Sequence, residues 1–306
     1  MTTLSSHNPS LKATILLILA FLAAFIPSSA MQALASEVIV VKNADLKPYR
    51  EVLRGFKDTC GCNIREVTIQ DEAGIEAVVH DSPDIIMAIG TASFKKVKAI
   101  RNSPIIYTMV VPWEVSLPLN QNISGVSMDI SPETYIATIM KVFPKAMRIG
   151  LLYNPLNTTS FVNAASKAAR AIGIELVTSA VSDPTEIPNA MNGLKGQIDV
   201  FWMLPDPTVV TPGLVDYLLN FSFEYNIPIF SFSRKYVEMG AIAALDIDPY
   251  DMGVEAAEIA KKISLGNSSA IRVYARKSTL SINAKVAAKM GLKIADDLLT
   301  QRNIVE

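Results

Sequence analysis

Short apolar runs alternate with amphipathic segments along most of the chain. Runs such as VIVVK at 38–42 and DIIMAIG at 84–90 are apolar at consecutive positions, which predicts strands buried on both faces. The segment PYREVLRGFKDTC at 48–60 instead repeats its apolar residues at helical spacing. This alternation predicts parallel sheets covered by helices on both faces.

The pattern occurs as two successive series, each about one domain long. Strands are expected at 38–42, 63–69, 84–90, 104–110, 147–152, 174–178, 198–203, 227–231 and 240–247, and a strand leading into a short helix at 278–292. Helices are expected at 48–60, 72–79, 92–101, 131–142, 158–171, 184–193, 209–225 and 249–264. The predicted fold class is therefore α/β, with two Rossmann-like, doubly wound lobes.

The last strand and helix do not fit a simple succession of two lobes. They follow the second series, which indicates that the chain crosses back and that each lobe is discontinuous. We predict lobe 1 at 36–128 plus 248–276 and lobe 2 at 129–247 plus 277–306. The proline-containing, weakly charged connection at 111–131 suits a hinge.

The first 35 residues have the form of an export signal. Lys12 precedes a run of small and apolar residues at 13–26, and the small residues Ala33 and Ala35 follow. The alternative is a membrane anchor, but that run spans only about 21 Å as a helix, against ~30 Å of hydrocarbon. We predict cleavage near Ala35 and a periplasmic or otherwise exported protein.

Composition narrows the choice of partners and cofactors. A formal net charge of −1 offers no basic face, so nucleic acid is not an expected partner. Cys60 and Cys62 are the only cysteines. We expect two thiols at a helix end, because a bridge across one residue is tight and one pair supplies too few ligands for structural zinc. No metal site and no cofactor are predicted.

The chain also lacks the usual signs of catalysis. His80 is the single histidine after the predicted signal, and it follows a helix rather than a strand. GxSxG, HExxH, GxGxxG and phosphate-loop motifs are absent from the sequence. We therefore predict that the protein is not an enzyme.

Polar residues follow nearly every predicted strand. In parallel sheets, ligands bind in the crevice beyond the carboxyl ends of the strands. The candidate ligand-binding residues at these ends are Asn43, Asp45, Thr91, Ser93, Trp113, Tyr153, Asn154, Thr159, Ser160, Asp206 and Asp246. The alternative for several of them, and for their neighbours Asn157 and Thr158, is helix capping or turn formation.

The order of several motifs resembles the substrate-binding proteins of ABC transporters, of the tryptophan/tyrosine-binding type. These motifs include NISGV, RIGLLYNP, IDVFWMLPD, IPIFSFS and GAIAALDIDPYDMG, and the likeness covers nearly all of 37–300. The resemblance implies the type I periplasmic-binding-protein fold, with two lobes joined by three crossovers that close on a small molecule. It also implies that Thr91 and Ala92 lie on one wall of the cleft, with Asn154, Thr159, Ser160 and Asp206 on the other.

Together these observations predict an exported solute-binding protein, with an amino acid or related molecule as ligand and an ABC permease as partner. The stretch 153–160 is expected to be a loop whose N–H groups and hydroxyls face the cleft. Asp206 and Asp246 would bind an amino group, and Trp113 or Tyr153 an aromatic part. The chain is expected to be a monomer. The alternative is a sensory receptor module of the same fold that signals to a membrane sensor; an enzyme ranks lower.

Overall fold

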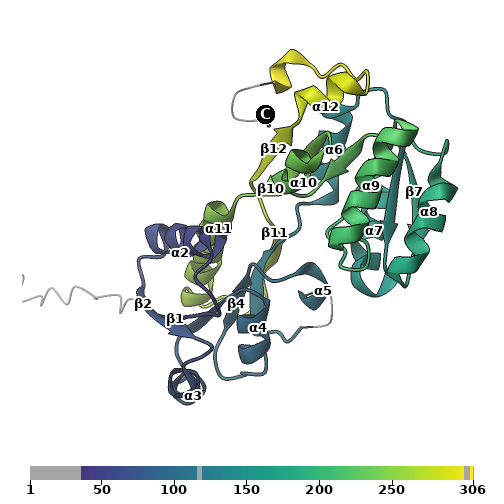
Figure 1. Ribbon diagram of the computed structural model, residues 1–306. Coiled ribbons are helices and arrows are strands. Elements are labelled where there is room, and N and C mark those ends of the chain that lie inside the picture. The colour runs from purple at the N-terminus through teal and green to yellow at the C-terminus, as the bar shows by residue number, and fades with distance from the viewer. Residues whose placement is uncertain (1–35, 116–118, 300–303, 306) are drawn as a thin grey trace, which may run out of the picture. The chain divides into compact units, whose positions relative to one another are not determined.

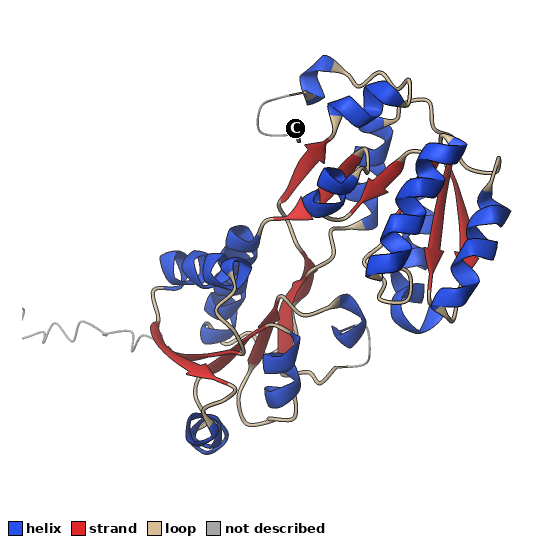
Figure 2. Cartoon of the chain, in the orientation of Figure 1, coloured by secondary structure: helices blue, strands red, loops and turns tan. Residues whose placement is uncertain are grey.

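The computed structural model describes residues 36–115, 119–299 and 304–305. The predicted export signal and its cleavage site near Ala35 lie outside the described residues. Figure 1 shows the order of the elements along the chain, and Figure 2 separates helices from strands.

The first sheet has six strands, all parallel, in the order β11-β5-β4-β3-β1-β2. Its strands are β1 (Glu37–Lys42), β2 (Asn63–Thr68), β3 (Ile85–Ile89), β4 (Ile105–Thr108), β5 (Ile123–Ser127) and β11 (Arg272–Tyr274). Val38 and Val40 face one apolar core and Ile39 and Val41 face another, all four being fully buried. This confirms the prediction of strands covered on both faces.

Helices of the first sheet come from two distant parts of the chain. They are α2 (Lys47–Cys60), α3 (Glu72–His80), α4 (Thr91–Val97), α5 (Pro112–Val115) and α11 (Pro249–Ser264). Helices α2 and α11 pack closely because Gly55 and Gly253 lie at their contact: a Cβ on Gly253 would lie 2.0 Å from the carbonyl oxygen of Val52. The chain has thus returned to the first sheet after β10 (Ala243–Ile247) of the second.

The second sheet has the order β12-β10-β9-β8-β6-β7. Its other strands are β6 (Arg148–Tyr153), β7 (Glu175–Ala180), β8 (Val200–Trp202), β9 (Ile229–Ser231) and β12 (Ser278–Ile282). Its helices are α6 (Pro132–Val142), α7 (Pro155–Ala171), α8 (Ile187–Leu194), α9 (Pro212–Tyr225), α10 (Arg234–Met239) and α12 (Ala284–Lys289), with short 3-10 turns η1 (Pro184–Glu186) and η2 (Asp296–Leu298). Strand β12 is antiparallel to β10, the exception to the expected parallel pairing, because it follows directly from β11 in the first sheet.

The described chain passes between the two sheets three times: after β5, after β10 and after β11. This is the connectivity expected of a type I periplasmic-binding fold. The residue bounds of the two lobes, 36–128 with 248–276 and 129–247 with 277–306, stay a prediction.

The expectation of two free thiols is wrong. Helix α2 ends at Cys60, and Gly61 follows in the left-handed conformation with a φ of 64°. This turn brings the Cα atom of Cys62 to 5.2 Å from that of Cys60, and the two side chains form a disulfide.

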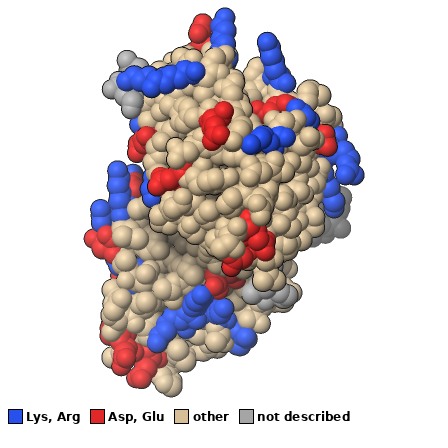
Figure 3. Space-filling view, turned by 45° about the vertical axis from the view of Figure 1, so that its right-hand side comes forward, with Lys and Arg blue, Asp and Glu red and all other residues tan. Residues whose placement is uncertain are grey.

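Charge is dispersed on the face shown in Figure 3, where small groups of either sign stand between broad uncharged areas. In the described part of the chain, no helix is both long and apolar enough to span a bilayer. The same residues contain no group of three or more His, Cys, Asp or Glu side chains able to hold a metal ion.

Candidate functional site

A cavity of about 430 Å³ lies where the loops that follow strands of both sheets meet. Its lining is mainly apolar and aromatic and consists of Val111, Pro112, Trp113, Met128, Tyr135, Pro205, Asp206, Pro207, Val210, Phe232, Ser233, Tyr236, Asp246 and Ile247. The residues after β4 and β5 come from the first sheet and those after β8 and β9 from the second, and Asp246 and Ile247 are the last two residues of β10. The cavity is therefore at the place that the strand-end argument predicts.

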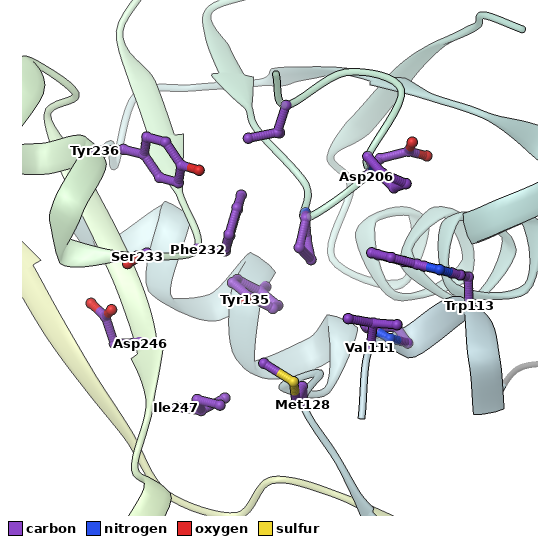
Figure 4. Close-up of a pocket in the computed structure, with 14 residues that line it drawn as sticks. Val111, Trp113, Met128, Tyr135, Asp206, Phe232, Ser233, Tyr236, Asp246 and Ile247 are labelled. Atoms are coloured by element: carbon purple, nitrogen blue, oxygen red, sulfur yellow. The ribbon is translucent and has the colours of Figure 1, made fainter. Parts of the chain in front are cut away.

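Figure 4 shows a polar end of the cavity, at Asp246 and Ser233, and an opposite end where Trp113 and Asp206 lie. Asp246, Ser233 and Tyr236 lie together on one side, and the hydroxyl of Tyr236 points into the cavity. Trp113 lies on the opposite side. The rings of Phe232 and Tyr135 occupy the space between.

Tyr135 gives the cavity a rigid aromatic wall. It lies on α6, is 3% exposed, and packs against Trp202 with ring centroids 5.1 Å apart. Phe161 and Phe230 approach the same ring edge-on, at 6.2 and 6.4 Å. Burial raises the pKa of the Tyr135 hydroxyl above its usual range, so this residue stays neutral.

Asp246 is the carboxylate that faces the polar end. Its two oxygens accept hydrogen bonds from the backbone N–H of Arg234, at 2.9 and 2.8 Å. Burial raises the pKa of the Asp246 carboxyl, and the nearby negative charge of Glu238 adds to this increase. The N–H and the positive charge of Arg234, together with the Ser233 hydroxyl, lower the pKa in part. A ligand cation placed beside Asp246 would offset this desolvation.

Asp206 also belongs to the cavity wall, but its carboxylate is fully buried and already bound. One oxygen accepts from the backbone N–H of Asn154 at 2.8 Å and from the Thr158 hydroxyl at 3.1 Å. The other accepts from the Asn157 amide at 3.0 Å and the Thr208 N–H at 2.9 Å. Four donors leave little capacity for a ligand amine, so this carboxylate ties α7 to the loop after β8.

The stretch 153–160 differs from the expected loop. Helix α7 begins at Pro155, because Asn154 caps it by accepting the N–H of Leu156 at 3.0 Å and proline suits the first helical position. The hydroxyl of Thr159 donates to the carbonyl of Pro155 at 2.7 Å. The polar groups of Asn154, Asn157, Thr158 and Thr159 are therefore used in the start of the helix and in binding Asp206, as in the capping alternative.

The remaining predicted site residues are dispersed. Asn43, Thr91 and Ala92 line a neighbouring hollow that shares Val111 and Met128 with the cavity. Asp45 is exposed beside Arg50, Ser93 is fully buried, and Tyr153 packs against the core of the second sheet. Ser160 lines a third hollow. Of the twelve predicted site residues, Trp113, Asp206 and Asp246 line the cavity, and the other nine do not.

Three aromatic residues of the cavity were not predicted as site residues: Tyr135, Phe232 and Tyr236. Phe232 directly follows β9, where a ligand-binding residue is expected. It was missed because the prediction chose mainly polar residues at the strand ends. Tyr135 lies on a helix face that also packs in the core. The spacing of apolar residues along the helix therefore cannot show whether Tyr135 packs in the core or contacts a ligand.

The third hollow, of about 290 Å³, is lined by the half-buried carboxylate of Asp129. Burial raises the pKa of Asp129 to about 7, and the Ser127 hydroxyl, which donates to it at 3.4 Å, lowers it in part. Tyr107, Tyr274 and Arg272 line the same hollow. The Arg272 guanidinium donates to backbone carbonyls, including that of Asn120 at 2.9 Å.

Comparison with protein families gives one match over most of the chain. The model of the family described as ABC transporter substrate binding protein matches residues 58–305. A tyrosine-binding protein of Clostridioides difficile is 31% identical over 200 residues, which is 62% of this chain. The match spans 57% of the length of that relative.

Two solved structures share the fold. The ligand-free, open structure of a substrate binding protein with adhesive properties from Clostridium difficile has a TM-score of 0.69 at 21% identity, covering 89% of this chain and 99% of that chain. An ABC domain from Streptococcus pneumoniae in complex with L-Trp has a TM-score of 0.58 at 20% identity, covering 89% of this chain and 100% of that chain.

Proposed function

The chain belongs to the family of ABC transporter substrate binding proteins, and from this premise we propose that it captures a small aromatic molecule in the cavity between Trp113 and Asp246. The family is not enzymatic, and its named members are substrate-binding proteins. The observation that carries the proposal is the cavity itself, which loops from both sheets form together.

The chemistry of the lining supports an aromatic ligand with an amino group, an amino acid or a related compound. Trp113, Tyr135 and Phe232 supply ring faces, each worth about 0.5–1.5 kcal/mol beyond the area they bury. Asp246 supplies the acceptor for an amino group. The name of the tyrosine-binding relative points to the same class. Added to the apolar area that the ligand buries when water is excluded, these contacts lead us to expect micromolar binding, about −8 kcal/mol.

Binding is proposed to couple the two lobes. Trp113 lies on α5, which follows β4 of the first sheet, whereas Phe232 follows β9 and Asp246 lies in β10 of the second. A ligand that contacts Trp113 together with Phe232 and Asp246 shifts the population toward the arrangement of the lobes in which all of these contacts form. The liganded form would then be recognised by an ABC permease, with the protein acting as a monomer.

Substrate-binding proteins of ABC transporters are exported. We propose that residues 1–35 direct export and are removed near Ala35, leaving the protein in the periplasm or an equivalent compartment. The proposed lobes are 36–128 plus 248–276 and 129–247 plus 277–306.

A thermal-shift screen with aromatic amino acids and amines tests the site. Any stabilising compound is retested on Trp113→Ala, which removes a ring that follows a strand of the first sheet, and on Phe232→Ala, which removes one that follows a strand of the second. Phe223→Ala is the matched control, because that ring is 45% exposed and does not line the cavity. We expect both cavity variants, and not the control, to lose the stabilisation. Stabilisation that survives in both would place the ligand elsewhere.

A further inference from the structure

The cavity lining is poor in groups that bind an anion. Among the described residues that form it, none is Lys, Arg or His, and three are prolines, which have no N–H to donate: Pro112, Pro205 and Pro207. A ligand carboxylate usually requires either a cationic side chain or a set of backbone N–H groups. The first kind of partner is missing from this lining.

Several backbone N–H groups of the lining are already used within the protein. The N–H of Val111 donates to the hydroxyl of Thr91 at 3.1 Å, and that of Val210 to the carbonyl of Asp206 at 2.8 Å. The N–H of Asp206 donates to the carbonyl of Leu204 at 2.8 Å. These three N–H groups are therefore not available to a bound anion, and the side-chain donors of the lining, such as the Trp113 indole N–H and the Ser233 and Tyr236 hydroxyls, are neutral.

Two carboxylates belong to the lining: that of Asp206 already accepts four hydrogen bonds from the protein, whereas that of Asp246 faces the polar end. The carboxylate of Asp246 lies beside Ser233 and the inward-pointing hydroxyl of Tyr236 (Figure 4). Arg234 does not line the cavity, and its guanidinium is paired with Glu238 at 3.0 Å. The polar end of the cavity therefore carries a negative charge that no lining cation balances.

We infer that this cavity selects an aromatic amine that has no carboxylate, with the ammonium group against Asp246 and the ring toward Trp113. The inference rests on the proposed function and narrows its ligand class. An amine satisfies the acceptors at the polar end and needs nothing else from the apolar walls.

An α-amino acid places a carboxylate next to its ammonium group, and so close to Asp246. That carboxylate would lose water and gain only neutral donors such as the Tyr236 hydroxyl, with no cation in the lining, and it would repel the carboxylate of Asp246. The cavity therefore discriminates against the zwitterion although the ring and the ammonium group fit equally well.

Calorimetric titration with four compounds of nearly equal ring structure tests the inference on the purified protein. Tyramine has no carboxylate, tyrosinamide has a neutral amide in its place, tyrosine has the carboxylate, and hydroxyphenylpropionate has the carboxylate but no amine. We expect tyramine to bind more tightly than tyrosine by at least about tenfold, and tyrosinamide to bind close to tyramine. Hydroxyphenylpropionate should be the weakest. Tryptamine and tryptophan form a second pair for a larger ring.

The possible results separate the inference from the function on which it rests. If tyrosine or tryptophan binds as tightly as its amine, the inference is overturned and the proposed function stands. If neither amines nor amino acids bind, both are overturned. If tyrosinamide binds as weakly as tyrosine, size rather than charge excludes the amino acid, which also overturns the inference.

The role of Asp246 is tested by Asp246→Asn, which keeps an oxygen to accept the N–H of Arg234. Glu238→Gln is the control, because it also removes one negative charge, but from a neighbouring side chain that does not line the cavity. We expect Asp246→Asn to weaken tyramine binding by at least about tenfold and to reduce the preference over tyrosine, with Glu238→Gln close to the parent. An unchanged preference in a folded Asp246→Asn protein would contradict the assignment.

Discussion

Replacement of Asp206 by alanine should destabilise the protein strongly. The carboxylate is fully buried and accepts hydrogen bonds from the N–H groups of Asn154 and Thr208, the hydroxyl of Thr158 and the amide of Asn157, at 2.8–3.1 Å. The substitution removes the acceptor and leaves these donors without a partner. It also releases the N-terminus of α7 from the loop after β8.

The magnitude follows from the burial and the charge of the acceptor. A hydrogen bond to a charged group contributes about 1.5–3 kcal/mol, so four would sum to ~6–12 kcal/mol. The variant also escapes the cost of burying a carboxylate, and the part-buried donors of Asn157 and Thr208 regain water. We therefore expect a loss of about 3–5 kcal/mol in the free energy of unfolding, typical of one partner removed from a buried charged network.

Equilibrium unfolding in urea measures this loss. Asp71→Ala is the matched control, because Asp71 also caps a helix but is exposed and accepts one N–H, from Gly74 at 2.9 Å; a cap of this kind contributes ~1 kcal/mol. Thr158→Val should cost stability in the parent and much less in the Asp206→Ala background. A loss in Asp206→Ala no larger than that in Asp71→Ala would refute the assigned network.

Two further predictions concern burial. Asp129→Asn should stabilise the protein above pH 7. Folding raises the pKa of the Asp129 carboxyl from 3.8 to about 7, so the parent protein loses stability as the pH rises between these values, whereas Asn carries no charge. At ~1.4 kcal/mol per pKa unit, the gain in the free energy of unfolding is at most ~4 kcal/mol. Urea unfolding measured from pH 4 to 8 should show this gain disappear at the acid end, and an equal gain at both ends would contradict burial of the charge as its cause. Gly253→Ala should destabilise by about 1–3 kcal/mol, because its Cβ would meet the carbonyl of Val52 at 2.0 Å. The control Gly193→Ala, with open space around its Cβ, should be neutral or stabilising, and similar unfolding midpoints for the two would contradict the close helix contact.

Hydrophobic patterning was enough to predict the architecture. Continuous apolar runs such as 85–89 can be buried only between two layers, and their alternation with helices leaves few topologies. The chain's return to the first sheet was also foreseen from the extra strand and helix near the C-terminus. Strand β11 was not predicted, because all three of its residues are exposed at a sheet edge and carry no periodic signal.

The details of the site depended on geometry that patterning does not contain. Asn154 and Pro155 are residues of a helix start, yet the hydroxyls that follow suggested a ligand-binding loop. The disulfide required the left-handed turn at Gly61. Tyr135 occupies a helix face that is apolar whether it meets a core or a cavity, so the sequence could not assign it to the site.

Fluorescence of Trp113 tests the central claim most directly. The chain has two tryptophans, and Trp202→Phe leaves Trp113 as the single reporter. The substitution removes no hydrogen bond, because the buried Nε1 of Trp202 has no partner within the described structure, and it keeps an aromatic ring beside Tyr135. Titration with tyramine should change the Trp113 emission to saturation, with the dissociation constant found by calorimetry. Emission that stays constant while tyramine raises the melting temperature would contradict binding in this cavity.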